Sequence, residues 1–246
     1  MDTEPDISGP VGHAAGMGWP ASRVRQIALA VGDLAVPLVC GGCGRPGTQW
    51  CPRCAAALVD APRAVHPRCE LDVPAWSVGR YDGPLRAAIL ALKEHGRRDL
   101  APILGDALAS ALIVLADWGE LSGSGALVLV PAPTRAASAR RRGGDPVTLT
   151  AEGAVSRLGD RVHVTALLRS GHFTRDSAGL SAGARSSNLA GAVTLTGRPP
   201  RAMREGRTVT VLVDDVLTTG ATAAASVRVL RRAGVHVAAV VVLANA

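Results

Sequence analysis

Apolar runs alternate with helix-like segments along most of the chain. The clearest runs are ALVLV after Gly125, VHVTALL from Val162, AGAVTLT from Ala190, VTVLV from Val209 and VHVAAVVVLA from Val235. A strand that is buried on both faces has this continuous apolar character, and a half-exposed strand would alternate. The alternation of strands and helices predicts an α/β fold, in which helices cover both faces of a mostly parallel sheet.

Four stretches are predicted to be helical. SRVRQIALAVGDLAVP places Val24, Ile27, Val31 and Leu34 on one helical face. Two helices are expected in YDGPLRAAILALKEHGRRDLAPILGDALASALIVLADW, with Pro84 in the first turn and Gly96 just after the last turn. The others are PVTLTAEGAVSRLG and a helix from about Gly220 to Ala233.

The N-terminal third has a different character. The first twenty residues have acids near Met1 and no apolar h-region, so we expect a cytoplasmic protein with a disordered tail over 1–20. Residues 55–80 are rich in Pro and Ala without a clear period, and we interpret them as a connecting segment. The resulting division is 1–20 as the tail, 21–80 as a helix, a cysteine module and the linker, and 81–246 as the main domain.

Composition and net charge limit the kinds of core and the classes of partner that we expect. The chain of 246 residues is 48% hydrophobic but only 2% aromatic, so its core is expected to consist of Val, Leu and Ala. No apolar stretch reaches the roughly 20 residues of a membrane span, which argues against membrane insertion. The net charge of +7 favours phosphate-bearing partners. Ordinary Arg-rich solubility explains the charge equally well.

Four of the five cysteines form two C-x2-C pairs, Cys40 with Cys43 and Cys51 with Cys54, separated by seven residues. In a reducing cytoplasm such pairs indicate a metal before a disulfide, and four thiolates match the tetrahedral shell of structural Zn(II). Redox dithiols and an empty, degenerate site are the alternatives. Three glycines, Gly41, Gly42 and Gly44, are expected to help the chain bend. Cys69 is left over, and a lone cysteine is more often a small packed side chain.

The stretch VTVLVDDVLTTGAT carries the candidate chemistry. Asp214 and Asp215 are expected to end a buried strand, and a small, hydroxyl-rich loop then leads into a helix. Backbone N–H groups at a helix N-terminus form an anion site, to which threonine hydroxyls add donors. Two carboxylates beside a phosphate make sense if the ligand also offers hydroxyl groups or a magnesium ion. A sugar phosphate combines these features. The stretch is neither a Walker A loop nor G-x-G-x-x-G.

Three loops leave the predicted carboxyl ends of the strands, at 131–145, 169–188 and 214–222. Ligands of parallel α/β sheets bind beyond these ends, so the loops are expected to converge.

VLVDDVLTTGAT resembles the signature of type I phosphoribosyltransferases that binds phosphoribosyl pyrophosphate (PRPP). By this resemblance Asp214 and Asp215 are the catalytic acids and contact the ribose hydroxyls. The loop that holds the 5-phosphate would then comprise Thr218, Thr219, Gly220, Ala221 and Thr222.

The order of the motifs resembles the ComF family of phosphoribosyltransferase-like proteins, some of which are linked to DNA uptake in competence. This order runs from the cysteine pairs through YDGPLRAAILALKEHG and VPAPTRAASARRRGG to LLRSGHFTRDSAGLSAGARSSNLAGAV and the acid pair. The resemblance implies a type I phosphoribosyltransferase-like sheet with a zinc module, and Mg(II) with PRPP at the site. Further PRPP-binding residues would be Pro133, Arg142, Arg169 and Arg185, with 169–188 as a hood.

Several positions bear less clearly on the site. Lys93 matches a lysine that occurs in the ComF family. A favourable interaction with the helix C-terminus explains a lysine at this position equally well. The run Arg140–Arg142 is either a diphosphate contact or a solvated face. The chain departs from the family at RGGDP, where RGFNQ is usual, and at Ser177, where a glutamine is usual.

Three functions follow from these patterns. The first is a phosphoribosyltransferase with an unidentified nitrogenous acceptor. The second is a non-catalytic module that binds PRPP or a related ribose phosphate and acts with single-stranded DNA or the competence machinery. The scarcity of aromatics argues against direct base stacking by such a module. The third is a degenerate fold kept for assembly, against which the costly acid pair argues.

Overall fold

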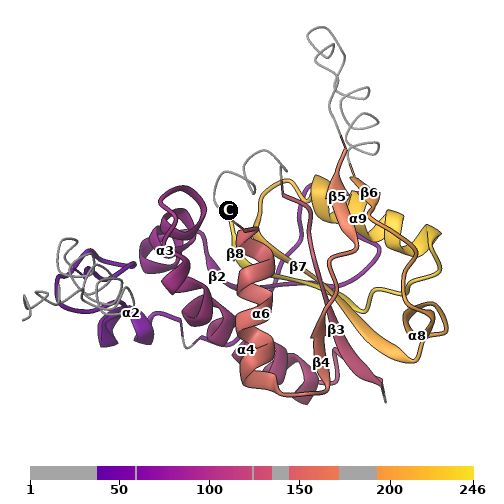
Figure 1. Ribbon diagram of the computed structural model, residues 1–246, viewed down its shortest axis with the longest axis horizontal. Coiled ribbons are helices and arrows are strands. Elements are labelled where there is room, and N and C mark those ends of the chain that lie inside the picture. The colour runs from indigo at the N-terminus through magenta and orange to yellow at the C-terminus, as the bar shows by residue number, and fades with distance from the viewer. Residues whose placement is uncertain (1–37, 59, 124, 135–143, 172–192) are drawn as a thin grey trace, which may run out of the picture. The chain divides into compact units, whose positions relative to one another are not determined.

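The computed structural model describes residues 38–58, 60–123, 125–134, 144–171 and 193–246. The chain divides into two compact units, Met1–Leu38 and Val39–Ala246, and the elements below belong to the second (Figure 1). The expected tail and the expected helix of residues 21–36 lie outside the described residues.

A six-stranded sheet forms the centre of the described unit, in the order β1-β2-β8-β7-β3-β4. The strands are β1 (Arg63–Ala64), β2 (Ala75–Arg80), β3 (Ala126–Pro131), β4 (Val162–Val164), β7 (Thr208–Leu217) and β8 (Ala239–Asn245). Every neighbouring pair is parallel except β1 with β2. The prediction of a mostly parallel α/β sheet is confirmed.

Helices flank this sheet on both faces, as the run pattern predicted. They are α3 (Gly83–Glu94), α4 (Ala101–Asp117), α6 (Pro146–Leu158), α8 (Arg201–Arg204) and α9 (Ala221–Arg232), and a 3-10 turn, η1 (Arg98–Leu100), joins α3 to α4. The short helix α2 (Pro52–Ala56) carries Cys54 and belongs to the cysteine module. Pro84 lies in the first turn of α3, and Gly96 follows its C-cap with a φ of 67°. Both boundaries agree with the sequence prediction.

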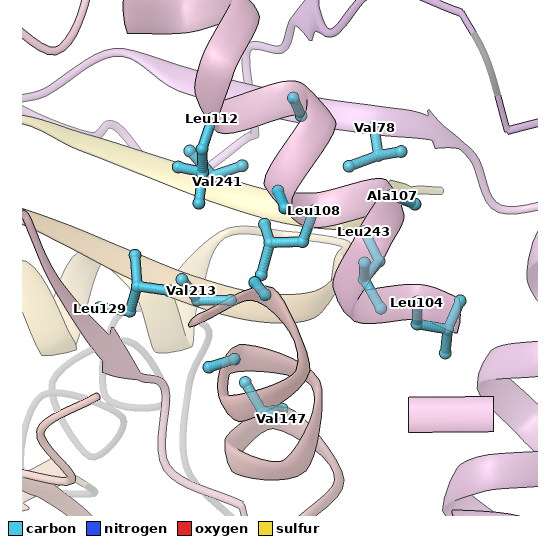
Figure 2. Close-up of a cluster of buried hydrophobic side chains, with 14 of the residues drawn as sticks. Val78, Leu104, Ala107, Leu108, Leu112, Leu129, Val147, Val213, Val241 and Leu243 are labelled. Carbon is cyan, nitrogen blue, oxygen red and sulfur yellow. The ribbon is translucent and has the colours of Figure 1, made fainter. Parts of the chain in front are cut away.

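Alternation along the central strands divides the core into two clusters. Val211 and Val213 of β7 face the cluster that contains α3, α4 and α6. Figure 2 shows this side, where Leu104, Leu108 and Leu112 of α4 lie over the sheet. Leu212 faces the opposite cluster, which contains α9. Up to Val213 the residues of β7 therefore alternate between the two clusters, whereas Val216 packs with the first cluster and Leu217 with the second.

Helices α4 and α6 approach closely where two glycines face each other. A Cβ on Gly105 would lie 2.6 Å from the carbonyl carbon of Gly153. We expect Gly105→Ala to lower the free energy of unfolding by about 1–3 kcal/mol, because overpacking exceeds the gain in helix propensity. Denaturant unfolding measures this. Gly197→Ala is the control, because its Cβ would meet no atom within 4 Å. A fully stable Gly105→Ala would contradict the packing argument.

Three sequence predictions need correction. Residues 75–80, interpreted as connecting segment, form strand β2, whose register runs alongside β8. The run from Val162 divides into β4 and β5 (Leu168–Ser170). The run AGAVTLT contains β6 (Val193–Leu195), which pairs antiparallel with β5 in a separate ribbon and not in the main sheet. Short apolar runs do not reveal which partner strand they pair with, because tertiary context decides it.

The sequence predicts that no apolar segment is long enough to span a membrane, and one helix of the structure does not agree with this prediction. Among the described residues, Arg98–Asp117 meets the requirements of length and composition. Of its apolar part, 56% is buried inside the protein. A core helix has this character, and α4 is the helix that covers the sheet in Figure 2.

Candidate functional site

The two acids lie within strand β7 and not after it. The strand continues to Leu217 and pairs with β8 beyond the acids, where Val216 lies opposite Ala244. The prediction that the acids end the strand was therefore wrong by two residues. Beyond Val213 the alternation between the two core clusters changes, since Val216 packs with the cluster of α3 and Leu217 with the opposite cluster. The Asp215 carboxylate reaches toward α3, where Lys93 lies.

Asp215 forms an ion pair with Lys93, from the last turn of α3. The Lys93 Nζ lies 2.8 Å from Oδ2 of Asp215, and the side chains are 30% and 10% exposed. Burial alone would lower the pKa of Lys93, but attraction to Asp215 outweighs it and holds that pKa above its usual value. Lys93 is therefore a charged member of the site and not only a helix-terminal cation.

Asp214 lies in a different electrostatic environment. Burial, followed by the charge of Asp215, raises the pKa of Asp214 to about 8, although Lys93 and the Asp215 amide oppose the rise. The Asp215 N–H donates to Oδ1 of Asp214 at 2.8 Å. Burial and the neighbouring carboxyl group therefore favour the protonated form of Asp214, whereas the Lys93 ammonium lies against Asp215.

The loop after β7 and the first turn of α9 contain the residues that the sequence predicts to hold a phosphate. Gly220 caps α9 with a φ of 82°, in the left-handed region that only glycine adopts readily. The Thr218, Thr219 and Thr222 side chains are exposed around the helix N-terminus, whereas Gly220 is buried. Helix N-termini attract anions through free N–H groups and the helix dipole. These residues therefore lie next to the acid pair, as predicted.

A segment that the sequence did not single out braces this loop. The Cys69 N–H donates to the carbonyl oxygen of Thr219 at 2.8 Å. A Cβ on Gly220 would lie 2.6 Å from Cβ of Pro67. Residues 67–69 therefore support the anion loop from the β1–β2 side, and Cys69 is partly buried there, outside the cysteine cluster. No pattern in HPRCELD indicates this contact, because it depends on the long-range pairing of β2 with β8.

The loop after β3 begins beside the acid pair. The Ala132 N–H donates to the Val213 carbonyl at 2.7 Å. Beyond it, the Thr134 hydroxyl donates to Asp145 at 2.8 Å. Asp145 also caps α6, because it accepts from the Thr148 N–H. An acid directly before a proline and a helical pattern is an N-cap signal, so the sequence could have identified Asp145.

The remaining predicted binding residues are only partly described. Pro133 lies in the loop after β3, where its carbonyl and that of Thr134 face the Ser170 hydroxyl. Arg169 is exposed on β5, and its Nε donates to Thr194 across the ribbon at 3.2 Å. The structure does not bring this guanidinium to the acids. Arg142, Arg185 and most of the expected hood lie outside the described residues.

The four paired cysteines converge, as their spacing predicted. Their Sγ atoms all lie within 4.8 Å of one another, and those of Cys43 and Cys51 are 3.7 Å apart. Four thiolates at about 2.3 Å from Zn(II) in a tetrahedron lie about 3.8 Å from each other, so the donor set fits this ion. The Cys51 N–H donates to Sγ of Cys40 at 3.4 Å.

The thiols differ in acidity. Burial would raise the pKa of Cys40, but backbone N–H donors prevail and lower it to about 6. Burial raises the pKa of Cys54. Metal binding requires thiolates, so a cation at this centre would have to offset the cost of ionising Cys54.

The cysteine module packs against the first turn of α3 and against η1, which follows that helix. A Cβ on Gly41 would lie 2.5 Å from the Leu100 side chain, and one on Gly42 would lie 3.0 Å from Pro84 and 2.8 Å from Sγ of Cys54. Only Gly44 has the left-handed φ, at 74°. The expectation that all three glycines serve bending is therefore corrected, since Gly41 and Gly42 instead permit close packing.

Comparison of the chain with protein-family models and with curated proteins gives no match.

Proposed function

We propose that this protein is a phosphoribosyltransferase of the ComF type, which binds PRPP with Mg(II) and transfers the phosphoribosyl group to a nitrogenous acceptor. The proposal includes a type I phosphoribosyltransferase-like fold for the main domain. The observation that carries it is the continuous unit of β7, the Gly220 turn and α9, in which a carboxylate pair precedes an anion-binding helix N-terminus.

The ligand chemistry follows from the two halves of this unit. The helix N-terminus and the threonine hydroxyls suit a phosphate monoester. The carboxyl groups would repel such a phosphate but can accept hydrogen bonds from sugar hydroxyls. The first residues after β3 adjoin the acids through Ala132 and Val213, which leaves this edge of the sheet for the diphosphate. A ribose that carries both a phosphate and a diphosphate would match the helix N-terminus, the acid pair and the edge of the sheet after β3.

In the proposed reaction the bond between ribose C1 and the pyrophosphate oxygen breaks, and its electron pair leaves with pyrophosphate. An acceptor nitrogen donates an electron pair to C1 and loses a proton. Mg(II) would neutralise part of the diphosphate charge. The described residues bind and orient the sugar, so catalysis would consist of positioning and electrostatic stabilisation.

Isothermal titration with PRPP and Mg(II) tests the binding step. Wild type is expected to bind, and Asp214→Asn is expected to weaken binding about 10- to 100-fold, because the amide NH2 replaces a carboxyl oxygen that would accept from a ribose hydroxyl. Asp160→Asn, at an exposed turn residue, is the matched control and should bind as wild type does. Failure of well-folded wild type to bind would contradict the proposal.

Pyrophosphate release in the presence of nitrogenous bases then separates the enzyme from the binding module. Release that depends on an acceptor supports the transferase. Tight binding of PRPP without release with any acceptor favours the non-catalytic alternative.

A further inference from the structure

We infer that Lys93 is a positioning residue of this site: it holds Asp215 on the α3 side of the sheet and leaves Asp214 as the acid that meets the ligand. The inference rests on the proposed function and assigns different roles to two acids that the sequence motif treats alike.

The composition of the chain makes Lys93 conspicuous. The chain has 27 basic residues, and every one except Lys93 is arginine. A lysine ammonium is a compact point charge, whereas a guanidinium is a broad, planar fork. Lys93 is the one lysine of the sequence, and its ammonium group lies 2.8 Å from the Asp215 carboxylate of the candidate site.

Geometry separates the roles of the acids. Asp215 is only 8% exposed, and its Oδ2 lies 2.8 Å from the Lys93 Nζ of α3. This carboxylate already has its charge partner within the protein. Asp214 is more exposed than Asp215, so it is the acid of the pair that a ligand can reach more easily.

The cysteine module fixes the helix that carries Lys93. Pro84, in the first turn of α3, packs against Gly42. After the helix, Arg97 donates to the Val39 carbonyl at 3.1 Å and pairs with Asp99 at 2.7 Å. Gln49, between the two cysteine pairs, donates to the Asp99 carbonyl. Both ends of α3 are thus held, which restricts where the Lys93 ammonium can lie.

Removal of the ammonium would change both acids. The Asp215 carboxylate would then be buried without its ion-pair partner, so its side chain would no longer be held beside α3. Asp214, whose Oδ1 accepts from the Asp215 N–H, would lose its orientation as well, although Lys93 itself need not touch the ligand.

Titration of PRPP and Mg(II) into Lys93→Met, Lys93→Arg, Asp215→Asn and the double variant Lys93→Met, Asp215→Asn tests this role. Lys93→Met is expected to weaken binding about tenfold, and Lys93→Arg, which keeps the charge, should recover most of it. Because a positioning residue acts through Asp215, the double variant should bind no worse than the weaker single variant.

The outcomes separate the alternatives. Additive losses would show that Lys93 contacts the ligand directly and would overturn the positioning role. Unchanged binding by Lys93→Met would overturn it as well.

A measurement without ligand separates this inference from the proposed function. Reductive methylation with ¹³C-formaldehyde labels Lys93 and the α-amino group, which titrate in different pH ranges. Asp215→Asn should lower the pKa of Lys93, whereas Asp160→Asn should not. An unchanged Lys93 pKa in Asp215→Asn, in a protein that binds PRPP, overturns the inference alone. A confirmed ion pair in a folded protein that does not bind PRPP overturns the proposed function, and with it any role of Lys93 toward this ligand.

Discussion

Cys54→Ser is expected to remove the bound metal and to lower the midpoint of thermal unfolding by about 6–12 °C. The ion, and not a hydrophobic core of its own, would hold the small cysteine module together, because metal binding is folding free energy for such modules. A loss of about 3 kcal/mol corresponds to this shift for a chain of this size. The effect should extend to α3, because Gly41 and Gly42 pack the module against Leu100 and Pro84.

Cys69→Ser is the matched control for this prediction. Cys69 lies outside the cluster, and its contact with the anion loop is made by its backbone N–H, which serine retains. Elemental analysis should find one zinc ion per chain in wild type and in Cys69→Ser, and none in Cys54→Ser. A reduced wild type that is free of metal and insensitive to chelators would contradict the zinc assignment and favour a dithiol or an empty site.

The sheet could be predicted from the sequence because its central strands are continuous apolar runs. Such a pattern is sufficient for β3, β7 and β8, which are buried on both faces. It failed for β2, whose sequence AWSVGR mixes polar and apolar residues and lies in a Pro-rich segment. Pairing with β8 places this strand in the sheet, and long-range pairing leaves no local pattern.

The candidate site was predictable to the extent that it is local in sequence. The acids, the Gly220 turn and the start of α9 are consecutive, so one motif revealed them. Lys93 and Asp145 come from distant elements, and only the fold brings them near. The difference between Asp214 and Asp215 was also hidden, because it results from the ion pair of Asp215 with Lys93 and from the different exposure of the two acids.

The second large effect is a gain in stability when Asp214 is replaced. The pKa of Asp214 is raised to about 8 by burial and by Asp215. Between about pH 4 and pH 8 the folded protein retains a proton that the unfolded chain releases, so this acid makes the protein less stable as the pH rises. Asp214→Asn removes this penalty, and asparagine can still accept from the Asp215 N–H through its amide oxygen.

We therefore expect Asp214→Asn to exceed wild type by up to about 5 kcal/mol in free energy of unfolding at pH 8 and to match it near pH 4. Denaturant unfolding across this range measures the difference, and Asp160→Asn should follow wild type throughout. A difference that does not depend on pH would place the Asp214 pKa in the usual range and contradict the burial argument. A variant that is more stable yet binds PRPP poorly would show that the acid is retained for its ligand, because destabilising groups persist where function needs them.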